Sequence, residues 1–214
     1  MARWGMVIDL KRCVGCQTCT IACKMGNFVP PGIFFTRVND FEIGKYPHVK
    51  RHFLPTGCMH CEDAPCVQAC PTGASVKRED GIVLVEKDLC VGCRYCMVVC
   101  PYGARHFNED GDAEYFASGP TPYESYGAGS HQRGTVIKCT FCAELIDRSA
   151  SQGLTPGIDR DATPFCVGSC IAGARFFGDL DDQDSEVSQL IRTRDAKPLQ
   201  EEIGTGPCVY YLPR

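Results

Sequence analysis

Cysteine dominates this sequence. It makes up 17 of the 214 residues, a density typical of chains held together by disulfides, zinc or iron–sulfur clusters. Sixteen of the cysteines fall into four groups of four: Cys13, Cys16, Cys19 and Cys23; Cys58, Cys61, Cys66 and Cys70; Cys90, Cys93, Cys96 and Cys100; Cys139, Cys142, Cys166 and Cys170. Secreted disulfide scaffolds are usually shorter than about 100 residues, whereas a chain of this length buries a core without such crosslinks. The clustering therefore favours metal binding.

The spacing within the groups separates zinc from iron–sulfur clusters. Groups one and three both have the form C-x2-C-x2-C-x3-C. Zinc usually takes two separated C-x2-C pairs, whereas three cysteines at x2 spacing curl round one corner of a [4Fe-4S] cube. The fourth cysteine of such a run turns away and binds a second cube. We therefore expect all sixteen grouped cysteines to be iron ligands of four [4Fe-4S] clusters.

The four groups arise from an internal duplication. Group one recurs as group three with a constant offset of 77, and Cys58 and Cys61 recur as Cys139 and Cys142 with an offset of 81. A short strand-like run, Met6–Asp9 in one copy and Val83–Glu86 in the other, leads into each C-x2-C-x2-C loop. The chain is therefore predicted to be a doubled two-cluster module. Spacing alone leaves two pairings open: one with four and two with three, or one with two and three with four.

With these motifs the chain resembles the four-cluster ferredoxin-like electron-transfer subunits of complex molybdopterin oxidoreductases. Polysulfide, thiosulfate, arsenate and dimethyl sulfoxide reductases have such subunits. The resemblance runs from Met1 to about Asp182. It is carried by the stretches Met6–Asp9, Ala22–Lys24, Val29–Gly32, His60–Cys66, Cys70–Ala74, Cys100–Arg105 and Lys138–Cys142. One departure is Ile171, which stands after Cys170 where the family usually has proline.

The resemblance implies the first pairing, and with it four ligand sets. These are Cys13, Cys16, Cys19 and Cys170; Cys139, Cys142, Cys166 and Cys23; Cys58, Cys61, Cys66 and Cys100; and Cys90, Cys93, Cys96 and Cys70. It also implies single-electron transfer between a molybdopterin catalytic subunit and a membrane quinone-reactive subunit. The alternatives are a stand-alone polyferredoxin that shuttles electrons between soluble enzymes, and a zinc-loaded structural module.

The expected fold is α+β, with two ferredoxin-like dicluster lobes related by the duplication. Motifs one and four predict a lobe over 1–57 with 136–182, and motifs two and three predict a lobe over 58–105. An insertion loop over 106–135 and a C-terminal helix-and-strand extension over 183–214 complete the organisation. Gly119-Pro120 and Thr121-Pro122 argue against a continuous helix within the insertion, which is either an inert surface loop or a partner contact.

Shorter patterns give more local expectations. A helix is expected from Ala143 to near Gly153, and another after the acidic run that ends at Glu186. His60 lies inside a group that already has four cysteines, so a supporting or surface position is expected. Cys208 is expected to be a buried free thiol. The sequence offers no nucleophile–base pair and no P-loop, so we expect no bond chemistry on a substrate.

Charge and hydropathy exclude other classes. A net charge of −4 gives no basic face for nucleic acid. No window reaches the roughly 18 apolar residues that a membrane span needs. The first residues show neither a signal-peptide core nor a twin arginine. The resemblance leaves two expected locations: the periplasmic face of the membrane, by co-export with a signal-bearing partner, or the cytoplasm.

Overall fold

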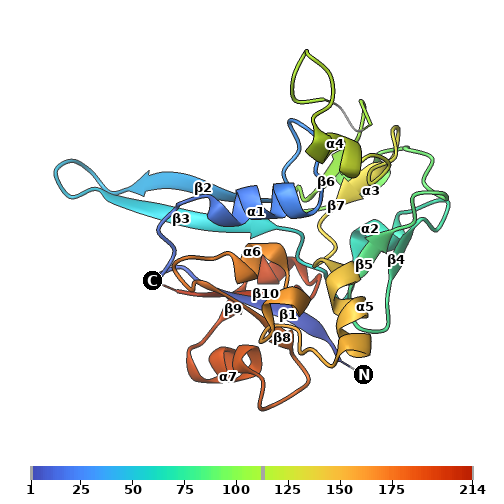
Figure 1. The fold of residues 1–214 in the computed structure, drawn as a ribbon. Helices are drawn as coiled ribbons and strands as arrows, with labels where there is room; N and C mark the ends of the chain where they lie inside the picture. The colour runs from blue at the N-terminus through green and yellow to red at the C-terminus, as the bar shows by residue number, and fades with distance from the viewer. Residues whose placement is uncertain (1, 112–113, 214) are drawn as a thin grey trace.

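The computed structural model describes residues 2–111 and 114–213, and it mixes short helices with short strands, as expected for an α+β protein (Figure 1). The helices are α1 Thr18–Gly26, α2 Pro65–Gln68, α3 Tyr95–Val98, α4 Pro122–Tyr126, α5 Ala143–Gln152, α6 Phe165–Gly168 and α7 Glu186–Thr193. The strands are β1 Trp4–Asp9, β2 Thr36–Ile43, β3 Lys50–Gly57, β4 Ser75–Lys77, β5 Val83–Val85, β6 Arg105–Phe107, β7 Val136–Lys138, β8 Arg175–Asp179, β9 Lys197–Pro198 and β10 Val209–Leu212. Single 3₁₀ turns occur at Arg160–Ala162 and Glu201–Ile203.

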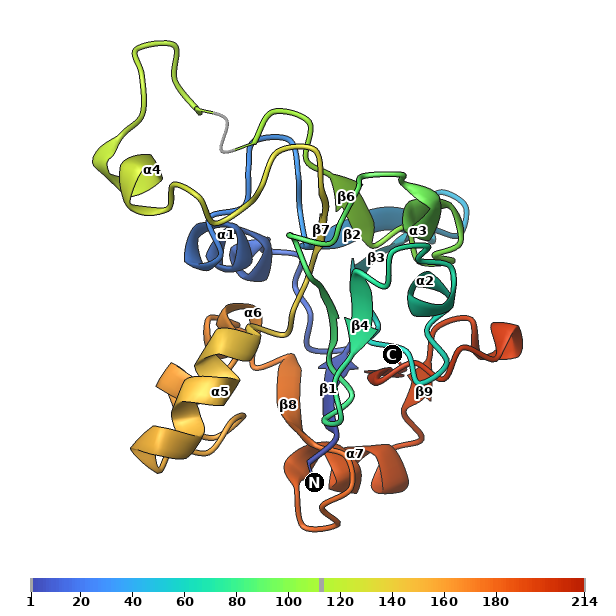
Figure 2. The same cartoon turned by 90° about the vertical axis from the view of Figure 1, so that its right-hand side faces the viewer.

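The N-terminal strand is central to a four-stranded sheet of order β8-β1-β10-β9. It pairs antiparallel with β8 and parallel with β10. Because successive side chains in a strand point to opposite faces, Met6 and Ile8 enter the main core, whereas Val7 packs with Val187 of α7 on the other face. The predicted strand before Cys13 is thus confirmed, and it is buried on both sides. Figure 2 shows α7 beside this sheet, away from the other helices.

Short strands flank each cysteine group. The antiparallel hairpin of β4 and β5 links Cys70 to Cys90, and the antiparallel pair β6 and β7 links Cys100 to Cys139. Strands of only three residues hold little stability by themselves. They serve here to fix the ends of the cysteine loops, so that loops far apart in the sequence face one another.

The longest pair of strands forms an arm. Strands β2 and β3 pair antiparallel from Thr36 opposite Gly57 to Ile43 opposite Lys50. Figure 1 shows this hairpin reaching out from the rest of the molecule. Only its base is buried: Val38 belongs to the core, whereas Tyr46 near the tip is 93% exposed.

Within 106–135 the structure describes residues 106–111 and 114–135, and these make specific contacts with other parts of the chain. The predicted break in helicity is present, because α4 begins only after Thr121, whose side chain and that of Glu124 form a capping box. The segment folds back onto the chain: the Tyr115 hydroxyl donates to the carbonyl of Val29 at 2.9 Å, and the His131 ring lies 2.8 Å from the carbonyl of Asn27. It therefore covers the C-terminal end of α1.

The other local expectations hold. Helix α5 runs from Ala143 to Gln152 and ends at Gly153, which has a left-handed φ of 66°. Helix α7 begins after Ser185, whose hydroxyl caps it by accepting from the Ser188 amide. The C-terminal extension supplies α7, β9 and β10. Among the described residues, no helix is both long enough and apolar enough to cross a membrane.

Candidate iron–sulfur sites

None of the seventeen cysteines is in a disulfide, and sixteen of them gather into four sites that draw on different parts of the sequence. Site A is lined by Cys13, Cys16, Cys19 and Cys170. Site B gathers Cys139, Cys142, Cys166 and Cys23. Site C is lined by Cys58, Cys61, Cys66 and Cys100. Site D is lined by Cys90, Cys93, Cys96 and Cys70. In each site one cysteine comes from a different group than the other three.

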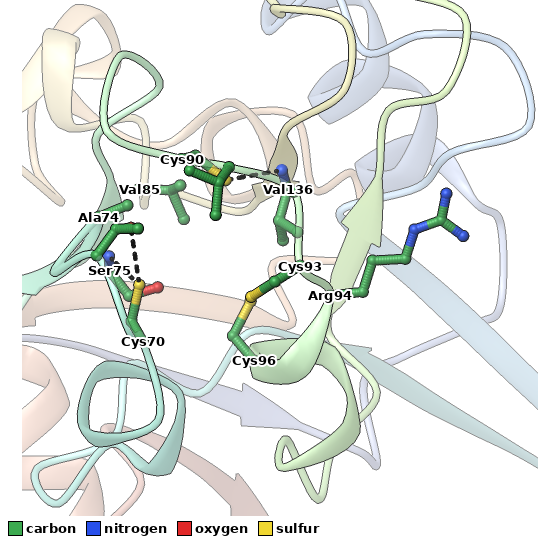
Figure 3. A pocket seen from close by; sticks show the side chains of 12 residues that line it. Cys70, Ala74, Ser75, Val85, Cys90, Cys93, Arg94, Cys96 and Val136 are labelled. Carbon is green, nitrogen blue, oxygen red and sulfur yellow. Dashed lines mark hydrogen bonds between the residues drawn. The ribbon is translucent and has the colours of Figure 1, made fainter.

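Site D illustrates how the backbone prepares such a site (Figure 3). The amide of Ser75 donates to the sulfur of Cys70 at 3.4 Å, and the amide of Val136 donates to the sulfur of Cys90 at 3.5 Å. Burial alone raises the pKa of Cys70, but amide and hydroxyl donors from Ser75 and Thr72 outweigh it and bring this pKa down to about 7. Donors aimed at sulfur stabilise thiolate and tune cluster potentials.

Glycine makes the tight loop of site D possible. Gly92 lies two residues after Cys90 with a φ of +68°, and a Cβ on it would stand 2.2 Å from the carbonyl oxygen of Gly134. Gly15 has the matching place in site A with a φ of +71°, and a Cβ there would stand 2.3 Å from the ring of Phe53. Only glycine accepts both the left-handed backbone and the close neighbour.

Site B depends on two helices that lie far apart in sequence. Helix α1 presents Cys23 to the site and packs against α6, which presents Cys166. The Asn27 amide nitrogen lies 3.7 Å from the sulfurs of both Cys23 and Cys142. One side chain therefore spans the two sequence groups. In addition, the amide of Phe141 donates a hydrogen bond to the Cys139 sulfur at 3.4 Å.

Burial keeps the thiols of the inner sites in their protonated form when no metal is bound. Burial raises the pKa of Cys61 to about 12, and its neighbours Cys58 and Cys66 add to the rise. Burial likewise raises the pKa of Cys142 to about 12, with Cys166 adding to it. Such thiols stay protonated at neutral pH unless a metal takes the place of the proton, because the thiolate is the metal-binding form.

Sites B and C meet at a stacked pair of rings. His60 and Phe141 stack with centroids 3.7 Å apart and planes inclined by 22°. The amide of Val83 donates to His60 Nδ1 at 3.1 Å, so the ring proton sits on Nε2, which has no hydrogen-bond partner in the described part of the chain. Burial, with help from the charges of Lys138 and Arg105, lowers the pKa of His60 far below its usual value. His60 is thus a buried, neutral imidazole, and a surface position for it is wrong.

Sequence analysis did not predict several of the residues that lie at these sites. Arg105 lines site C and donates to the Cys66 sulfur at 3.0 Å, and Arg175 lines site A. Each lies five residues after the last cysteine of a group, Cys100 or Cys170, and this shared spacing is the one signal in the sequence that could have found them. Asn27 carried no such signal. Figure 3 shows the Arg94 side chain pointing away from the cysteines of site D, and its guanidinium donates to Glu109. Cys208 is buried at 1% exposure, as expected.

The donor sets fit [4Fe-4S] cubes. Each site offers four thiols, and three of the four sites are small clefts lined mainly by cysteines and apolar residues, with Arg105 in the lining of site C and Arg175 in that of site A. Backbone amides point at sulfurs in three sites, including that of Ala174 at the Cys170 sulfur of site A at 3.3 Å. Four thiolates, water exclusion and N–H donors to sulfur are what such a cluster requires.

Comparison with known proteins agrees with this geometry. Two family models described as 4Fe-4S dicluster domains match residues 12–74 and 49–115. The chain is 42% identical to a putative dimethyl sulfoxide reductase iron-sulfur subunit of Halobacterium salinarum, over 99% of this chain and 79% of the relative. It is 40% identical to the arsenate respiratory reductase iron-sulfur subunit of Shewanella sp. (98% and 96%). It is 37% identical to the iron-sulfur cluster-binding subunit of menaquinone reductase of Nitratidesulfovibrio vulgaris (99% and 89%).

The fold, the four cysteine sites and the two dicluster matches define an electron-transfer protein that carries four [4Fe-4S] clusters. The clusters supply one-electron redox chemistry, and the polypeptide supplies ligands, burial and hydrogen bonds. The chain belongs to the family of four-cluster, ferredoxin-like iron–sulfur subunits found in oxidoreductases of the dimethyl sulfoxide reductase type.

Proposed function

We propose that the protein conducts single electrons along the order A–B–C–D, with the four cysteines of each site as the ligands of one cluster. The observation that carries this proposal is the gathering of cysteines from different groups round each site. The order follows from shared elements. Sites A and B share α1 and α6, sites B and C meet at His60 and Phe141, and sites C and D share the packed helices α2 and α3.

The two outer sites are the proposed points of electron entry and exit. Cys16 of site A and Cys93 of site D are exposed, whereas every cysteine of sites B and C is buried or half-buried. Exposed apolar side chains surround both outer sites: Val14 and Ile171 at site A, Val91 and Val98 at site D. Clustered apolar side chains that remain exposed mark protein interaction surfaces.

The partners we propose are a molybdopterin catalytic subunit at one end and a membrane quinone-reactive subunit at the other. The support is the relatives, whose names include dimethyl sulfoxide, arsenate and menaquinone reductases. The chain would then contact the membrane subunit peripherally. We propose a location at the membrane, on its periplasmic face after co-export with the catalytic subunit or on its cytoplasmic side. Fractionation of the native host distinguishes the two.

A paired charge insertion tests the proposal. In the natively purified complex, Val14→Glu and Val91→Glu place the same charge at equivalent positions of sites A and D. Each should leave the cluster content unchanged and block electron exchange with one partner, and the partner blocked should differ between the two. If one variant blocks electron exchange with both partners, or blocks exchange with neither, the proposed order is contradicted. Purification of the chain free of any larger subunit would favour a stand-alone polyferredoxin instead.

A further inference from the structure

Three cationic side chains are buried without an acidic partner among the described residues. Arg105, Lys138 and Arg175 are exposed by only 3%, 3% and 7%. In residues 2–111 and 114–213, none of the three lies within ion-pair distance of a carboxylate. A buried charge without a counter-charge is strongly destabilising. Their anions must therefore be something other than Asp or Glu.

Arg105 lies between sites C and D. One guanidinium nitrogen donates to the Cys66 sulfur of site C at 3.0 Å, and the other donates to the Ser75 hydroxyl at 2.8 Å. On its other side, Arg105 reaches Cys96 of site D: burial raises the pKa of Cys96, and Arg105 opposes that rise by its charge and a hydrogen bond. A single guanidinium thus reaches ligands of both sites.

Arg175 has the equivalent position between sites A and B. It begins β8, as Arg105 begins β6. It lines site A, and the Thr36 hydroxyl and the Met6 sulfur, at 3.0 and 3.6 Å, hold its guanidinium in place. Burial raises the pKa of Cys166 in site B, and Arg175 opposes that rise by its charge and a hydrogen bond.

Lys138 lies at the remaining junction. It immediately precedes Cys139 of site B, and its ammonium donates to the carbonyls of Val83 and Cys139. Val83 lines site C and Cys139 belongs to site B, so this ammonium contacts the backbone of both sites. Each of the three junctions along the order A–B–C–D therefore contains one buried cation.

We propose that Arg175, Lys138 and Arg105 are the counter-ions of the electron path, each shared by the two clusters at its junction, and that they raise the reduction potentials of both. This inference rests on the proposed ligand sets. A cube with four thiolates is anionic, and one-electron reduction adds a further negative charge. A fixed cation in a low-dielectric site stabilises the reduced form more than the oxidised form. Sharing one cation between two neighbours also reduces the repulsion between their charges.

The test is a potentiometric titration of the full-length, cluster-loaded protein, followed by electron paramagnetic resonance, with iron counted in every sample. Arg105→Met should lower the potentials of the C and D signals and leave those of A and B unchanged. Arg175→Met should lower the potentials of the A and B signals and leave those of C and D unchanged. We expect at least about a tenfold fall in the equilibrium constant for reduction, which is about 59 mV for one electron. Arg105→Lys keeps the charge and should restore most of the potential.

Arg94→Gln is the matched control, because Arg94 lies between two site D cysteines but is exposed and paired with Glu109. Its potentials should match the wild type. The inference is overturned if fully loaded Arg105→Met and Arg175→Met titrate like the wild type, or if Arg105→Lys shifts the potentials as much as a charge-removing variant. If Arg105→Met loses iron, the potentials of Arg105→Lys decide the matter at this junction: values near the wild type support the inference, and values lowered by about 59 mV or more contradict it. Fewer than four clusters in the wild type would instead count against the proposed function.

Discussion

His60 stacks on its own counterpart in the duplicated sequence. The offset of 81 that carries Cys58 to Cys139 also carries His60 to Phe141, and both residues have a left-handed φ, 45° and 54°. The two copies of one loop therefore meet face to face at the junction of sites B and C, with ring centroids 3.7 Å apart. The duplication supplies the contact that joins its two halves.

Removing this contact should destabilise the whole fold. Phe141 also packs edge-on against Phe177 at 5.3 Å and is 2% exposed, so Phe141→Ala should lower the free energy of unfolding by about 3–5 kcal/mol. Chemical unfolding under anaerobic conditions, followed by circular dichroism and visible absorbance, measures the loss.

The hairpin arm offers the control for this prediction. Phe41 stacks on His52 with centroids 5.8 Å apart, the same pair of residue types, but it is 43% exposed. Phe41→Ala should change the free energy by less than about 0.5 kcal/mol. Equal effects of the two substitutions would show that the His60–Phe141 stack is not a core contact.

The metal content should match the number of ligands. Sixteen cysteines at four per cube correspond to about sixteen iron and sixteen sulfide ions per chain. Colorimetric iron and sulfide assays on the natively purified protein measure both. About twelve iron ions would mean that one site is incomplete, and zinc in place of iron would refute the cluster interpretation.

The exchange of ligands between groups can be tested one cysteine at a time. If Cys23 binds the cluster of site B, Cys23→Ser should alter the same paramagnetic signal as Cys166→Ser. Cys19→Ser should alter a different signal, although Cys19 and Cys23 lie on the same helix. Cys208→Ala is the control, since this thiol lies in no site, and it should leave all signals intact. Matching spectra for Cys23→Ser and Cys19→Ser would place both cysteines on one cluster.

Gly92 should be irreplaceable at site D. In Gly92→Ala the new methyl group meets the Gly134 carbonyl, so the loop must move and the site D cluster should be lost or become labile. Gly73→Ala separates this clash from backbone strain, because Gly73 has a similar φ of +70° and open space beside it. Gly73→Ala should lower the free energy of unfolding by only about 1–2 kcal/mol and should keep four clusters. Iron content and thermal stability compare the two, and similar losses would show that strain alone is responsible.

The clusters should also be needed for folding. Metal binding and folding are coupled where ligand loops make up much of a core, and the main core includes Cys19, Cys61 and Cys166. Protein stripped of iron under anaerobic conditions should show no cooperative thermal transition in circular dichroism. A native-like transition in the stripped protein would contradict this.

The sequence predicted the cysteine chemistry because ligand spacing is local and the duplication makes it visible twice. It also predicted α5, since Gly153 supplies a left-handed stop. Spacing could not choose between the two pairings of motifs, because that choice depends on contacts such as α1 with α6 across more than a hundred residues. The position of β10 beside β1, parallel to it, was equally invisible. The burial of His60 depends on a ring contributed by another copy of its own loop.

The placement of β1 between β8 and β10 determines when the molecule can be completed during synthesis. Its two neighbours include the last strand of the chain, Val209–Leu212. Sites A and B likewise join cysteines from the first 23 residues with cysteines after residue 138, whereas sites C and D draw theirs from residues 58–100. Sites C and D can therefore close before the segment that carries Cys139–Cys170 has been synthesised, whereas sites A and B must wait for it.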